Sequence, residues 1–209
     1  MDLLARAIPA VAVILCVVGC GVNRKLKLTE VQPNAIEVYL DEPSSHRLDL
    51  TNLKLTWAAK DAATPPTRGE INLGVGGTLD GGRFLIIWED TNYIGAPVRQ
   101  NFQPSVAGIK VPSGSFPPYG NTPGVSVRVA GKHYRSLFLV RDQVSDVVRF
   151  GPMPRPDRFG AFTEDGSLAA EKPSGNRSIS RDFSAGAPVD TDSESDWSVR
   201  FASPGAPTQ

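Results

Sequence analysis

The sequence predicts an all-β protein, a β-sandwich built from roughly eight or nine short strands. Short runs that alternate apolar and polar residues recur along the chain, and clusters of Gly, Pro and Asn separate them. No stretch shows the sustained helical periodicity of an amphipathic helix. Because no crossover helices are visible, we expect two stacked sheets rather than one parallel sheet.

The first residues of the chain have the pattern of a secretory signal. One positive side chain, Arg6, precedes a short apolar run, and the small residue Gly19 closes it. The alternative is an uncleaved membrane anchor, but the run is shorter than the roughly 20 apolar residues that a spanning helix needs. We therefore expect residues 1–19 to be a signal peptide that is removed.

The residue after the expected cleavage point is Cys20. Val17, Val18 and Gly19 precede it, so this segment resembles the lipobox of bacterial lipoproteins, whose cysteine receives acyl chains. The resemblance implies lipidation of Cys20, a membrane as partner and a location in the cell envelope. In a Gram-negative cell, the residue after the cysteine, a Gly rather than an Asp, implies the outer membrane.

Two further ranges complete the predicted organisation of the chain. Residues 20–26 are expected to form a short linker, and residues 27–207 one folded domain. A chain of this size buries enough surface for a single hydrophobic core. Both cysteines lie within the first 20 residues, so we expect the domain to be held by packing without disulfides.

The charge balance limits the classes of partner. The chain has 22 basic and 22 acidic residues, and its formal net charge is zero. Nucleic-acid binding draws most of its affinity from Lys and Arg side chains that contact phosphates. We therefore expect no nucleic-acid partner.

The early strands are predicted from period-two alternation. Residues 36–41 place Ile, Val and Leu on one face and Glu, Tyr and Asp on the other, which is typical of a half-buried strand. Residues 53–57 repeat this pattern. Residues 84–88 are apolar at both parities, so we expect this strand to lie centrally with both of its faces covered.

The later strands follow the same reasoning. Residues 125–129, 136–140 and 146–150 predict a meander of three strands. A late strand is expected to begin at Ile179. Residues 197–201 alternate again and predict the last strand of the fold.

Two long irregular segments, residues 95–124 and 151–176, interrupt the strand pattern. Loops of this length in a compact domain are usually functional or disordered. The first contains Phe116 and Tyr119 around a proline pair, and aromatic side chains on a preordered proline segment can dock a partner at modest entropic cost. The alternative is an insertion that lies flat over the sandwich.

Four groups of segments follow one another along the chain in a recognisable order. They are Leu28-Thr29-Glu30-Val31 with Ile36-Glu37-Val38-Tyr39, then Leu48-Asp49-Leu50 through Leu55, then Thr78-Leu79-Asp80-Gly81-Gly82 through Ile86, and finally Asp146–Gly151, Ser178–Arg181 and Asp190–Gly205. Taken in this order, they resemble the lamin-tail domain, which occurs in nuclear lamins and in secreted or envelope proteins of bacteria. The resemblance implies an immunoglobulin-like β-sandwich that acts as a non-catalytic binding or tethering module, with an envelope protein or a polysaccharide as partner.

An acidic segment before the last strand is the best candidate for a metal site. Its carboxylates stand at every second position, and hard oxygen ligands spaced in this way wrap Ca²⁺ when the backbone turns. Such a site predicts a calcium-stabilised adhesion module or, as another alternative, a metal-dependent hydrolase. The competing interpretation is that the segment only caps and solubilises the approach to the strand. Its residues are Asp190, Asp192, Glu194 and Asp196.

Other patterns that carry chemistry are weak. No G-x-S-x-G sequence is present, and the two histidines, His46 and His133, have no partner at metal-ligand spacing. The glycine-dense residues 74–82 lack the Lys-Ser/Thr ending and the following helix of a phosphate-binding loop, so we interpret them as a hairpin connection. We therefore expect a protein that is not an enzyme and has no cofactor other than the calcium considered above.

Overall fold

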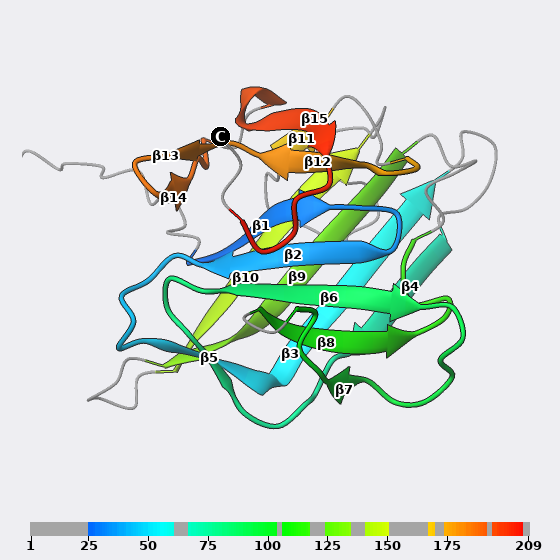
Figure 1. The fold of residues 1–209 in the computed structure, drawn as a ribbon, viewed down its shortest axis with the longest axis horizontal. Coiled ribbons are helices and arrows are strands. Elements are labelled where there is room, and N and C mark those ends of the chain that lie inside the picture. The colour runs from blue at the N-terminus through cyan, green and yellow to red at the C-terminus, as the bar shows by residue number, and fades with distance from the viewer. Residues whose placement is uncertain are drawn as a thin grey trace, which may run out of the picture.

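The computed structural model shows an all-β fold with two main sheets (Figure 1). Within the described residues there is no α-helix, and no helix long and apolar enough to cross a membrane. A single turn of 3₁₀ helix is present there, η1 (Glu194–Asp196). The expected signal peptide, Cys20 and most of the expected linker lie outside the described residues. The structure describes residues 25–60, 67–103, 106–117, 124–134, 141–150, 167–169, 174–191 and 194–206.

The first sheet has seven strands in the order β15-β12-β1-β2-β6-β8-β7. All neighbours pair antiparallel except β6 and β8, which run parallel. The strands are β1 (Leu26–Val31), β2 (Ala35–Leu40), β6 (Phe84–Asp90), β7 (Val98–Arg99), β8 (Ala107–Pro112), β12 (Arg177–Arg181) and β15 (Trp197–Phe201).

The second sheet has the strand order β11-β10-β9-β3-β4, with β5 paired to β3. In Figure 1 its strands run behind those of the first sheet and cross them. A separate two-stranded ribbon, β13 with β14, follows β12. The bounds are β3 (Arg47–Lys60), β4 (Thr67–Asn72), β5 (Thr78–Asp80), β9 (Gly124–Tyr134), β10 (Arg141–Phe150), β11 (Ser167–Ala169), β13 (Phe183–Ser184) and β14 (Ala187–Pro188).

The main hydrophobic core lies between the two sheets. Leu28, Val38 and Leu85 come from the first sheet, and Leu55 and Val129 from the second, all without solvent exposure. Each fully buried side chain of this kind contributes roughly 1.5–3 kcal/mol relative to exposure in water. Burial of these alternating apolar positions is what holds the two layers together.

A second, smaller cluster covers the other face of the first sheet. Ile86 of β6 lies there with Ala35 and Val106, and Trp88 and Phe102 pack against them. Because its neighbours Leu85 and Ile87 belong to the main core, β6 is covered on both faces. The prediction of a central strand at residues 84–88 is confirmed.

Most of the other predicted strands are also found. Residues 36–41 fall almost entirely in β2, 53–57 in β3, and 197–201 in β15, and Ile179 lies within β12. The expected three-strand meander is wrong, because residues 125–129 of β9 and 146–150 of β10 pair directly with each other, with no strand between them. Residues 136–140 lie outside the described residues. The described residues form fifteen strands rather than eight or nine, because several pairings involve only two or three residues.

The segment 95–124 corrects the expectation of a long loop. It contains β7 and β8, and β8 runs parallel to β6 inside the first sheet. The sequence pattern did not predict β8, because Gly108 and Pro112 flank the short alternation of Ile109 and Val111 on both sides. Of the other long segment, the structure describes only β11 and the residues that lead into β12.

Candidate functional site

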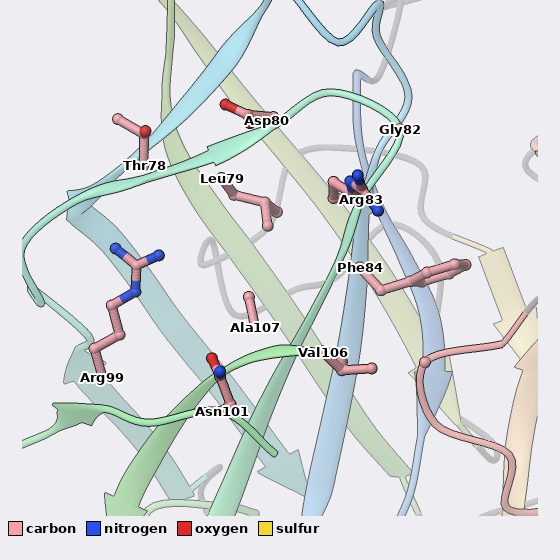
Figure 2. Close-up of a pocket in the computed structure, with 11 residues that line it drawn as sticks. Thr78, Leu79, Asp80, Gly82, Arg83, Phe84, Arg99, Asn101, Val106 and Ala107 are labelled. Carbon is pink, nitrogen blue, oxygen red and sulfur yellow. The ribbon is translucent and has the colours of Figure 1, made fainter. Parts of the chain in front are cut away.

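A pocket of about 600 Å³ opens where β5, the start of β6, the end of β7 and the start of β8 meet (Figure 2). β5 pairs into the second sheet and the other strands belong to the first, so the pocket lies at a seam between the sheets. Leu79, Val106 and Ala107 give it an apolar lining. Its polar lining residues include Thr78 and Asn101.

Two arginines give the pocket its charge. Arg83 follows the β5–β6 turn and Arg99 ends β7, and both side chains are exposed. Figure 2 shows them on opposite sides of the pocket, with Leu79 between them. The carboxylate in the lining is that of Asp80, whose Oδ1 lies 3.3 Å from Nε of Arg47, a residue outside the pocket. The pocket therefore presents an excess of positive charge.

The glycine-dense segment supports one of these arginines. Nη1 of Arg99 lies 3.4 Å from the carbonyl oxygen of Gly76, to which it donates. Gly77 has φ of 105°, and a Cβ atom at this position would overlap Nη1 of Arg99. Leu50 donates its N–H to the carbonyl of Gly77 at 3.1 Å, which ties the turn to β3. Sequence reasoning found no cation for this segment because Arg99 comes from a separate strand.

The C-terminal segment forms another part of the wall and is held by two buried carboxylates. The N–H of Ser203 donates to Oε1 of Glu30 at 3.1 Å, and the N–H of Gly205 donates to Oε2 of Glu37. Thr29 donates its hydroxyl to the other oxygen of Glu37 at 2.6 Å. Gly205 itself lines the pocket. The two carboxylates therefore position one side of the site without facing into it.

Burial sets the protonation behaviour of these carboxylates. Glu37 is only 3% exposed, and desolvation by burial raises its pKa to about 8, although hydrogen bonds from Thr29 and Gly205 oppose this. The pKa of Glu30 is raised by the same cause. The carboxyl group of Glu37 is therefore mainly protonated at neutral pH, which lowers the cost of keeping two acids close together in the interior.

The described carboxylates of the acidic segment contact different protein groups rather than one another. Oδ1 of Asp190 lies 2.6 Å from Nη1 of Arg181. Asp196 is buried and accepts from both the N–H and the hydroxyl of Thr191, at 2.7 and 2.6 Å. Asp192 lies outside the described residues, and Glu194 belongs to η1. In the part of the chain that the structure describes, no three His, Cys, Asp or Glu side chains are grouped to hold a metal, and calcium binding here stays a prediction.

The interior also holds a charged network that sequence reasoning did not find. Arg181 of β12 is fully buried, and its Nη2 lies 2.8 Å from Oδ2 of Asp146. Its Nε donates to the carbonyl of Leu28 at 2.8 Å, and its guanidinium stacks 4.6 Å from the ring centroid of Trp197. Nη1 of Arg181 donates to the carbonyl of Val189 and to Asp190, so every nitrogen of the guanidinium has a partner within the fold, and we assign Arg181 a structural role.

Of the two aromatic residues expected to bind a partner, the structure describes one. Phe116 is 6% exposed and belongs to the main core, and its N–H donates to Oε2 of Glu89 at 3.0 Å. The structure therefore places Phe116 in the interior rather than on a docking surface. Glu89 of β6 accepts the N–H groups of both Gly114 and Phe116, which holds the turn after β8 against β6. Tyr119 lies outside the described residues.

Fold and site together define a two-sheet β protein with an arginine-flanked pocket at the seam of its sheets. No protein-family model matches the chain, and a search of curated proteins finds no match to it. The function is therefore proposed from the sequence of the leader and from the residues of the fold and the pocket.

Proposed function

We propose that this protein is a lipid-anchored protein of the cell envelope whose β domain is a non-catalytic binding or tethering module. The observation that carries the proposal is the position of Cys20 directly after a small residue at the end of the apolar leader. The first strand begins at Leu26, so about six residues connect it to the cysteine. A flexible linker of this length spans on the order of 13 Å, which keeps the domain close to its membrane.

A lamin-tail-like, immunoglobulin-like sandwich is the second part of the proposal. It is supported by the agreement between the matching segments and the strands. Residues 28–39 cover β1 and β2, residues 48–55 lie in β3, and residues 78–86 span β5 and the start of β6. The closing segments correspond to β10, β12 and β15. The matched pieces therefore fall largely within strands, as the resemblance implies.

The residue types in the pocket favour binding over catalysis. The guanidinium groups of Arg83 and Arg99 present N–H donors in a planar fork, which suits them to orient an anionic group. Asp80, the carboxylate of the lining, is in an ion pair with Arg47. This set of side chains is suited to recognise and hold a ligand at the envelope.

The anchor is tested by Cys20→Ala in the native host. We expect the unaltered protein to sediment with membranes and to take up labelled fatty acid, and the variant to do neither. Cys16→Ala is the matched control, because Cys16 follows Leu15 rather than a small residue and should keep both properties. Continued membrane sedimentation and labelling of the Cys20→Ala protein would refute the proposed anchor.

A further inference from the structure

We infer that the pocket between β5 and β8 binds an acidic sugar, a saccharide ring that carries a carboxylate or a phosphate group. This inference deepens the binding role proposed above and rests on it. It names the chemistry of the ligand from the side chains that line the site.

The anionic group of the ligand is assigned to the two arginines. A guanidinium offers a planar fork of N–H donors that matches the oxygens of a carboxylate or a phosphate. Arg83 and Arg99 flank the pocket, and both are solvent-exposed and belong to its lining. Because Asp80 pairs with Arg47, its negative charge is offset from outside the pocket, and an anion gains a net attraction.

The sugar ring is assigned to the rest of the lining. The amide of Asn101 supplies donors and an acceptor that suit the hydroxyl groups of a saccharide. Leu79, Val106 and Ala107 offer an apolar surface to the C–H face of the ring. The volume, about 600 Å³, is in the usual range of roughly 300–1,000 Å³ for small-molecule sites.

The site is built on parts of the fold that fix its shape. Thr78 and Leu79 lie on β5, Arg99 ends β7, and Ala107 begins β8. The turn at Gly76 accepts a hydrogen bond from Arg99, and the wall at Gly205 is fixed by Glu37. The backbone of the site and the Arg99 side chain are therefore held in place before a ligand binds, which favours affinity.

Isothermal titration of the full chain, purified from the fraction in which it occurs, tests the inference. Three probes are compared: an oligogalacturonate, a hexose phosphate and a neutral oligosaccharide of matched length. We expect at least one acidic probe to bind and the neutral probe not to bind. In the R83Q/R99Q double variant the Kd for that acidic probe should rise at least tenfold, because both charge-assisted contacts are lost.

Arg177→Gln is the matched control, since Arg177 is an exposed arginine on β12, away from the pocket. It should leave the Kd unchanged, and thermal melts of all variants check that they are folded. Binding of the oligogalacturonate identifies a carboxylated sugar, and binding of the hexose phosphate identifies a phosphorylated one. Binding of neither acidic probe, equal binding of the neutral probe, or an unchanged Kd in R83Q/R99Q overturns the inference.

The Cys20→Ala protein distinguishes failure of this inference from failure of the proposed anchor. Titration of this variant with the acidic probes tests the pocket in the absence of a lipid. If the sugar binds but the Cys20→Ala exchange does not alter membrane sedimentation, the pocket assignment holds and the anchor fails. If sedimentation changes but no acidic sugar binds, the anchor holds and the pocket assignment fails.

Discussion

Arg181 and Asp146 form an ion pair in the interior that joins the two sheets, with Nη2 and Oδ2 2.8 Å apart and both side chains fully buried. Arg181 lies on β12 of the first sheet and Asp146 on β10 of the second. The same Oδ2 accepts the N–H of Leu28 at 2.8 Å, and the carbonyl of Leu28 accepts from Arg181. Strand β1 is therefore fixed to both partners of the pair.

Removal of the negative partner should destabilise the protein strongly. Asp146→Ala leaves the guanidinium of Arg181 buried with one carboxylate fewer and leaves the N–H of Leu28 without its acceptor. We expect the free energy of unfolding to fall by about 3–5 kcal/mol, the usual cost of breaking a buried ion pair. Urea denaturation followed by tryptophan fluorescence measures this change.

Asp80→Ala is the control for that experiment. Asp80 also pairs with an arginine, Arg47, but both side chains are more than half exposed. We expect it to cost no more than about 1 kcal/mol, because solvent screens exposed pairs. Equal losses in the two variants would contradict the role given to the buried pair.

The raised pKa of Glu37 predicts a stability that falls as the pH rises. Its pKa is about 8 in the folded protein, against 4.5 for an unperturbed glutamate, so between these values the folded state holds a proton that the unfolded state releases. Stability from this group is complete below about pH 4.5 and is lost as the pH rises toward 8. For one proton the slope is at most about 1.4 kcal/mol per pH unit.

Glu37→Gln tests this assignment. The amide keeps the size of the side chain but does not titrate, so the decline in unfolding free energy between pH 5 and 8 should become shallower. A residual slope of the same sign is expected from Glu30, whose pKa is also raised by burial. Parallel curves for the unaltered protein and the variant, from urea titrations at each pH, would refute the assignment.

The sequence was sufficient for most strands but not for the site. Alternation identified β2 and β3, and apolar residues at both parities identified β6, because burial pattern is a local property of a strand. β8 was missed because glycine and proline mask its short alternation. The hydrogen bond between Glu37 and Gly205 joins residues 168 positions apart, and Arg99 reaches the pocket from a separate strand. Such pairings depend on tertiary structure, which no local pattern encodes.

Gly205 should tolerate a side chain less well than a glycine of similar backbone conformation. It has φ of 83°, and an added Cβ would lie 2.7 Å from Cγ2 of Val106. Gly205→Ala should therefore loosen the C-terminal segment from Glu37, and limited proteolysis should remove that segment faster. We expect a loss of stability greater than the roughly 1–2 kcal/mol typical of a left-handed non-glycine residue.

Gly114→Ala provides the comparison for Gly205→Ala. Gly114 has φ of 80°, but an added Cβ there has no neighbour within 4 Å. The Gly114→Ala variant therefore measures the free-energy cost of an alanine in the left-handed conformation, without the steric overlap that Val106 causes at Gly205. If both variants lose the same stability and the C-terminal segment is cleaved at the same rate, packing of Gly205 against Val106 is not what holds the segment.

The sequence leaves two alternatives for the acidic segment, a calcium site or a cap on the approach to β15, and the melting temperature separates them. We expect calcium to leave it unchanged, because two of the four carboxylates already have protein partners. Asp190 pairs with Arg181, and both oxygens of Asp196 accept from Thr191. A cation would have to replace these contacts before it gained oxygen ligands. Differential scanning fluorimetry with Ca²⁺, with Mg²⁺ and with a chelator measures the effect. A ligand that binds only the folded state at 100 times its Kd adds about 2.7 kcal/mol, so a rise specific to Ca²⁺ would be readily detected and would show that the segment binds the ion.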